Sequence, residues 1–168
     1  MGHEPELGER LPALGPRGQG WVAGQMLLIF LEGIVSFPAF RELPPDNPAA
    51  WLSLAGGAAL LVSGLWLVYR GIGDLGTNVT ALPAPLDQAT LVETGVYLHV
   101  RHPIYAGVMA CALGWAFLVV SLPALVLALL LAGWLDLKSR REEVWLLAHH
   151  PGYAAYRLRT HRFVAGLY

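Results

Sequence analysis

The chain has 168 residues, of which 55% are hydrophobic and only 14% are charged, and its formal net charge is -1. Soluble domains carry about 25% charged residues, so this composition, with a mean hydropathy of +0.51, favours one integral membrane domain over two soluble ones. The net charge gives no reason to expect a nucleic-acid partner, and the single cysteine, Cys111, excludes an internal disulfide and a cysteine-rich metal site.

The first 40 residues contain two different segments. Residues 1–20 mix glycine, proline and charges of both signs without periodicity, which predicts a flexible arm rather than a signal peptide. Residues 21–40 are apolar apart from Gln25, Glu32 and Ser36, and at about 1.5 Å per residue they reach about 30 Å, the thickness of a bilayer core. Glu32 inside this span is either the polar wall of a substrate cavity or a structural group, hydrogen-bonded between helices or simply protonated.

The second predicted span covers residues 50–70 and follows a proline-rich break. Trp51 and Trp66 lie near its two ends, where the interfacial aromatic belt of a membrane protein is expected. Residues 71–102 are rich in glycine, proline and threonine, so we expect a linker outside the hydrocarbon.

The 33 residues from Pro103 to Leu135 contain no Asp, Glu, Lys or Arg. This run is too long for one span, and Pro123 lies where a tight hairpin could reverse the chain. Two short spans, 103–120 and 122–137, are therefore predicted, followed by a polar tail, 138–168, that leaves the membrane as a helix. The predicted fold is an all-α integral membrane bundle of about four spans, the last two forming a helical hairpin, with a cytoplasmic C-terminal helix.

The distribution of cationic residues predicts the orientation of this bundle. With both termini in the cytoplasm, every Lys and Arg of the chain except Arg41 lies on the cytoplasmic side, as the positive-inside rule requires. The linker 71–102 and the tail 138–168 then meet at the cytoplasmic face of a multi-pass membrane protein.

Two polar blocks at that face carry candidate functional residues. Pro103 suits the first turn of a helix, whose free N–H groups could bind a carboxylate or phosphate beside Arg101 and His102; alternatively these two side chains only anchor the helix at the interface. In the tail, Lys138 and Glu142 are four residues apart and share a helix face, where they could also form a solvated ion pair. No group of residues has metal-ligand spacing, so we expect no metal.

The stretches LGTNVTALPAP, LVETGVYLHVRHPIYAG and EEVWLL with GYAAYRLRTHRF resemble the isoprenylcysteine carboxyl methyltransferase family and its bacterial relatives, which are similar to phospholipid N-methyltransferases. The resemblance covers about residues 75–165. It implies that residues 21–168 form a membrane methyltransferase domain, and that this domain lies in a bacterial inner membrane or a plasma membrane. It implies that S-adenosylmethionine binds at the cytoplasmic face and that a lipophilic or lipidated acceptor enters from the bilayer. The residues that it places in the cofactor pocket are Leu91, Val92, Tyr97, His102, Pro103, Tyr105 and Glu142.

The resemblance also assigns chemical roles. His102 and the helix start would hold the cofactor carboxylate, Glu142 an ammonium or ribose hydroxyl, and the Tyr97 and Tyr105 faces the sulfonium. Lys138 or Arg141 would align a carboxylate acceptor, whereas an ammonium or phenol acceptor would need Glu142 or His102 as a base. The candidate catalytic residues are therefore Lys138, Arg141 and Glu142.

Two departures from the family pattern leave the acceptor open. Lys138 stands where the family's lead members carry arginine, and RFVAGLY at the C-terminus lacks the usual proline after the Arg-Phe pair. The carboxylate of an isoprenoid or isoprenylcysteine-like substrate is the favoured acceptor. A phospholipid-type N-methyltransferase, a membrane reductase with a nicotinamide cofactor and a non-catalytic scaffold are the alternatives, and the sequence does not indicate an oligomeric state.

Overall fold

The computed structural model describes residues 7–37 and 48–166, and within these ranges the chain is helical, with no β-strand. The predicted all-α fold is therefore confirmed. The α-helices are α1 (Leu7–Arg10), α2 (Gln19–Ser36), α3 (Pro48–Leu75), α4 (Pro103–Leu118), α5 (Leu122–His149) and α6 (Tyr153–Arg159), and the 3-10 turns are η2 (Gly76–Asn78) and η3 (Gly95–Leu98).

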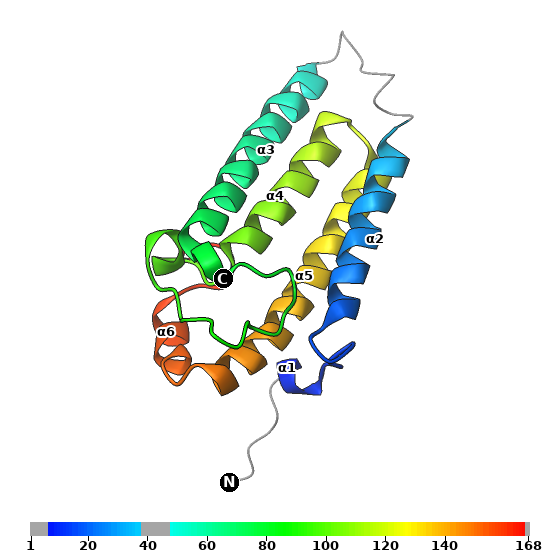
Figure 1. The fold of residues 1–168 in the computed structure, drawn as a ribbon. Helices are drawn as coiled ribbons and strands as arrows, with labels where there is room; N and C mark the ends of the chain where they lie inside the picture. The colour runs from blue at the N-terminus through cyan, green and yellow to red at the C-terminus, as the bar shows by residue number, and fades with distance from the viewer. Residues whose placement is uncertain (1–6, 38–47, 167–168) are drawn as a thin grey trace.

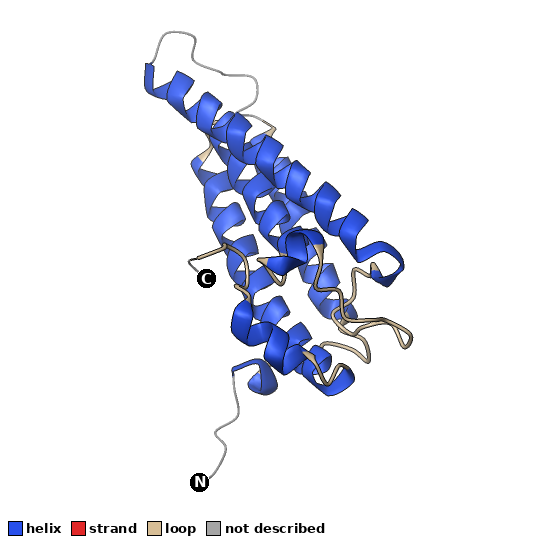
Figure 2. Ribbon diagram, turned by 90° about the vertical axis from the view of Figure 1, so that its left-hand side faces the viewer, coloured by secondary structure: helices blue, strands red, loops and turns tan. Residues whose placement is uncertain are grey.

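The four longest helices lie side by side in the order α3, α4, α5, α2 (Figure 1). Helix α3 packs on α4, α4 on α5, and α5 on α2. The turn between α4 and α5 lies at one end of the bundle, and the linker and α6 gather at the other (Figure 2). One end of the molecule therefore collects segments that are far apart in sequence.

Three of these helices, α2, α3 and α5, are long and apolar enough to cross a membrane, and α4 is a shorter apolar helix of 16 residues. Many large apolar side chains of these helices are exposed, including Phe30, Leu52, Val62 and Leu122. In water such a surface would be unstable, whereas against lipid it is the expected one. The bundle is that of an integral membrane protein.

The predicted reversal near Pro123 is confirmed. Helix α4 ends at Leu118, and the Ser121 hydroxyl caps α5 by accepting a hydrogen bond from the Ala124 N–H at 3.3 Å.

The tail helix predicted from residue 138 is not a separate element, because α5 runs unbroken from Leu122 to His149. Residues 136–149 contain no glycine or proline that would end it.

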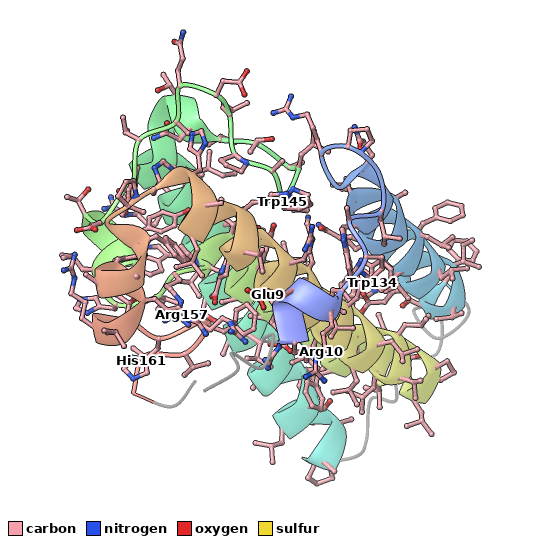
Figure 3. The ribbon with its side chains drawn as sticks, turned by 90° about the horizontal axis from the view of Figure 1, so that it is seen from below. Glu9, Arg10, Trp134, Trp145, Arg157 and His161 are labelled. Carbon is pink, nitrogen blue, oxygen red and sulfur yellow. The ribbon has the colours of Figure 1, made fainter. Side chains whose placement is uncertain are left out.

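The N-terminal arm differs from the flexible segment that the sequence predicts. Helix α1 lies against α5, where a Cβ on Gly8 would come within 2.4 Å of the Arg140 carbonyl oxygen. The residues after α1 are tied to α2, because the Trp21 indole donates to the Pro12 carbonyl at 3.1 Å. Figure 3 shows α1, with Glu9 and Arg10 labelled, across the near end of α5. Residues 1–6, the predicted end of the first span (38–40) and Arg41 lie outside the described residues.

Glycines bring α3 and α4 into close contact, a feature that the sequence analysis did not identify. Gly57, Gly64 and Gly71 of α3 are seven residues apart, about two helical turns, and share one face. A Cβ on Gly64 would lie 2.6 Å from the carbonyl oxygen of Gly107 on α4, and one on Gly57 would lie 2.7 Å from that of Gly114. Small residues of this kind let membrane helices approach backbone to backbone.

We predict that Gly64→Ala destabilises the protein by roughly 1–3 kcal/mol, because the added methyl group must push α3 away from α4. Gly56→Ala is the matched control, since Gly56 lies on the same helix and a Cβ added there would meet no atom within 4 Å. Thermal unfolding in detergent measures both. Equal melting temperatures for the two variants would contradict the close contact.

Candidate functional site

A cavity of about 210 Å³ lies at the end of the bundle that carries the linker. Its walls come from α2, the end of α3, α4, α5, α6 and the linker, so no single segment forms it. The lining combines apolar residues, such as Leu91 and Val108, with the side chains of Lys138, Glu142 and Tyr97. The cavity is therefore positioned where the apolar helices meet the polar end of the molecule.

The linker is tied across this cavity at several points. The Asn78 carboxamide accepts from the Thr90 N–H at 3.1 Å, which closes the loop at its neck. The Ala84 N–H donates to the Arg17 carbonyl at 3.4 Å, and Lys138 donates to the Ala81 carbonyl at 3.1 Å. These bonds hold the proline-rich part of the linker over α5 and the start of α2.

Lys138 is buried, with an exposed fraction of only 1%. Its ammonium donates to the Gln25 side-chain oxygen at 2.7 Å and lies 4.8 Å from the centroid of the Tyr105 ring. The interpretation of Lys138 and Glu142 as a solvated ion pair is therefore wrong, because α2 and the linker cover the lysine. Two neutral oxygens thus hold the Lys138 nitrogen in the wall of the cavity.

Glu142 and Tyr105 form a direct pair in the cavity wall. The Tyr105 hydroxyl donates to Glu142 Oε2 at 2.5 Å, and the Tyr105 ring stacks on His102 with centroids 5.4 Å apart and planes 5° from parallel. Helix α4 supplies Tyr105 and α5 supplies Glu142, so the packing of these two helices fixes the position of the carboxylate.

Glu143, the neighbour of Glu142, is the centre of a buried ionic cluster on another side of α5. Its carboxylate is 3% exposed and accepts from Arg101 at 3.0 Å and from Arg162 at 3.2 Å, with His102 Nε2 at 3.2 Å and Arg157 Nε at 3.6 Å. We call these five residues the Glu143 cluster. The sequence analysis missed Glu143, because nothing in the sequence distinguishes it from its neighbour Glu142. It also missed Arg162, because the pairing of Arg162 with Glu143 is visible only in the fold.

The Glu143 cluster joins the start of α4 to the C-terminal tail. Main-chain bonds reinforce it: the Arg101 N–H donates to the His161 carbonyl at 2.8 Å and the His102 N–H to the Arg162 carbonyl at 3.0 Å. The Arg101 guanidinium also donates to the carbonyls of Arg157 and Thr160. Residues 99–102 are therefore locked to residues 157–162, and His102 turns Nε2 toward Glu143, although the sequence analysis assigned it to a cofactor carboxylate.

Besides Tyr105, three tyrosines line the cavity, and two of them have hydroxyl groups with protein partners. The Tyr156 hydroxyl donates to the Tyr97 carbonyl at 2.7 Å, and the Tyr97 hydroxyl donates to the Gly71 carbonyl at 3.3 Å. Burial raises the pKa of Tyr156 to about 12, so its hydroxyl stays a donor. The Tyr153 hydroxyl is buried and has no hydrogen-bond partner among residues 7–37 and 48–166.

Most of the predicted site residues meet at this cavity. Those that line it are Leu91, Val92, Tyr97, His102, Tyr105, Lys138 and Glu142. Pro103 and Arg141 do not: Pro103 is buried against α3 as the first residue of α4, and the Arg141 guanidinium lies 4.6 Å from the centroid of the Trp145 ring. Sequence reasoning did not assign Gln25, Tyr153 or Tyr156 to the site, and their roles depend on how α2 and α6 pack.

Glu32 does not line the cavity. It is 5% exposed, and its Oε1 atom has no hydrogen-bond partner in the described part of the chain. The interpretation of Glu32 as a wall of this cavity is therefore not supported.

The family model for phospholipid methyltransferase matches residues 52–151, more than half of the chain. The match covers most of α3, the linker, α4 and α5, and ends before the tail that supplies Tyr153 and Arg162. A comparison with curated proteins found no match.

We predict that Glu143→Gln lowers the free energy of unfolding by roughly 3 kcal/mol or more, because the arginines of a buried cluster lose their counter-charge. Glu93→Gln is the control: Glu93 pairs with Arg159 on the surface, where such pairs contribute about 0–1 kcal/mol. Thermal or denaturant unfolding of the two purified variants tests this, and a Glu143→Gln protein as stable as the Glu93→Gln protein would contradict it.

Proposed function

Because the chain belongs to the phospholipid methyltransferase family, we propose that it is an integral membrane methyltransferase that uses S-adenosylmethionine and a lipophilic acceptor. The observation that carries this proposal is the position of the cavity. Its polar lining, with Glu142 and Tyr97, suits a water-soluble zwitterion, whereas Val108 and Ile104 of the apolar helix α4 line it as well. A polar cofactor and a lipid-like acceptor can both reach such a place.

The residues of the cavity fit this cofactor. When bound, S-adenosylmethionine supplies a methyl group on a cationic sulfonium. The Glu142 carboxylate can accept a hydrogen bond from the cofactor's ammonium or ribose hydroxyl. Tyr105 already contacts the Lys138 ammonium and the His102 ring, so Tyr97 is the better aromatic partner for the sulfonium.

Lys138 is the residue that favours a carboxylate acceptor. Gln25 and Ala81 hold its ammonium in place, and Arg141, the other candidate, does not line the cavity. A carboxylate needs no base before it attacks a methyl group, so the task of the protein is to orient it and exclude water. We therefore propose the carboxylate of an isoprenoid or isoprenylcysteine-like molecule as the acceptor, with Lys138 aligning it.

A phospholipid amine is the second candidate, and the description of the matching family favours it. A protonated amine must lose a proton before it can be methylated, and Glu142 would be the base. A carboxylate acceptor thus depends on Lys138 for its alignment, whereas a protonated amine depends on Glu142 as a base.

We also propose that both termini are cytoplasmic, since every Lys and Arg except Arg41 then lies on that side. A reporter fused after Tyr168 and active only outside the cytoplasm would contradict this orientation.

We predict that the purified protein binds S-adenosylmethionine and not NADPH, and that Glu142→Gln weakens this binding by tenfold or more, about 1.4 kcal/mol. Isothermal titration with both compounds measures this. Binding of NADPH alone would favour the reductase, and binding of neither would favour a scaffold. Glu93→Gln is the control variant, because Glu93 does not line the cavity.

We predict that Lys138→Met abolishes most methylation of lipophilic acids and leaves cofactor affinity nearly unchanged. Lys138→Arg should retain far more activity, because arginine keeps a cation that can bind a carboxylate at two points. Methylation assays with a panel of lipophilic acids and phospholipid amines measure both effects. Wild-type turnover of acids by Lys138→Met would contradict the aligning role, and turnover of amines alone would favour the second candidate.

A further inference from the structure

The Tyr153 hydroxyl is the feature of the cavity that packing within the protein does not explain. Tyr153 is 2% exposed and lines the cavity, yet its hydroxyl oxygen has no hydrogen-bond partner in the described residues. A buried hydroxyl without a partner is destabilising, and phenylalanine would fill the same space without that cost. The hydroxyl is therefore placed to bond something that enters the cavity.

Two anchors fix Tyr153 at this position. Its ring packs against Tyr156 with centroids 5.7 Å apart, and the Tyr156 hydroxyl is bonded to the Tyr97 carbonyl. The following residues, Arg157 and Thr160, accept hydrogen bonds from Arg101 through their carbonyl groups. Helix α6 is thus tied to Tyr97 and to Arg101, which fixes the position of the Tyr153 ring.

The surroundings of the Tyr153 hydroxyl indicate which ligand atom it meets. Burial and the nearby carboxylates of Glu143 and Glu142 raise the pKa of Tyr153, so it stays a neutral donor. The charge of Arg101, which also lines the cavity, acts on the pKa in the opposite direction but more weakly than the two carboxylates. The hydroxyl therefore offers a neutral donor, and a charged acceptor gives such a donor its strongest hydrogen bond.

An α-amino acid places a carboxylate and an ammonium on the same carbon atom, so the groups that bind them must be neighbours. If Glu142 takes the ammonium, the carboxylate needs a donor of the same cavity that is not already bonded within the protein. Lys138 already donates to Gln25 and Ala81, whereas the Tyr153 hydroxyl has no partner in the described residues. We propose that the Tyr153 hydroxyl donates a hydrogen bond to the carboxylate of the cofactor's amino-acid portion. This inference rests on the proposed use of S-adenosylmethionine.

The test compares Tyr153→Phe with the parent protein by isothermal titration of two ligands. S-Adenosylhomocysteine carries the amino-acid portion, and 5′-methylthioadenosine has the same nucleoside and thioether without it. We expect Tyr153→Phe to bind S-adenosylhomocysteine at least tenfold more weakly and to bind 5′-methylthioadenosine as the parent does. Its melting temperature without ligand should equal or exceed that of the parent, because no bond within the protein is lost.

Tyr156→Phe is the matched control from the same helix. Its hydroxyl has a protein acceptor, so its removal should lower the melting temperature. Unchanged affinity of Tyr153→Phe for S-adenosylhomocysteine, an equal loss for both ligands, or a lower melting temperature of Tyr153→Phe would each overturn the proposal. If the parent protein bound neither ligand, the proposed function itself would fail, and that result is distinct from any of these.

Discussion

The buried carboxylate of Glu143 is the group on which the polar end of the molecule depends. Side chains from three separate segments converge on it: Arg101 and His102 before α4, Arg157 in α6, and Arg162 in the tail. A buried carboxylate is stable only with such partners, and buried guanidinium groups in turn need a carboxylate. The same ion pairs therefore set the position of the tail and of the residues before Pro103, and both segments contribute residues to the cavity wall.

In the apolar part of the bundle, close helix packing takes the place of ion pairs. In lipid there is little hydrophobic force between helices, so close packing and backbone contact hold α3 and α4 together, and their glycines permit both. This contact fixes the position of the start of α4, which carries Tyr105. Tyr97 is attached to the same pair of helices, because its hydroxyl donates to the Gly71 carbonyl near the end of α3.

The combination suits chemistry between a water-soluble donor and a lipid-soluble acceptor. The charged side chains of the Glu143 cluster lie at the end of the bundle that carries the linker, and Lys138 is buried there with Gln25 of α2 as its partner. The proposed methyl transfer from a sulfonium to an anion would neutralise charge, so the site would mainly have to orient both reactants and exclude water.

Apolar runs, helix breakers and family motifs are local signals, and they were enough to predict the all-α membrane fold, the hairpin at Pro123 and the meeting of Tyr97, His102, Tyr105 and Glu142. They could not separate Glu142 from Glu143, which point about 100° apart on one helix, so that one lines the cavity and the other holds the arginines. Nor could they show that α2 buries Lys138, that α3 and α4 touch through glycines, or that Tyr153 has no partner among the described residues. These features are visible only in the folded chain, because burial and pairing depend on contacts between segments that are distant in the sequence.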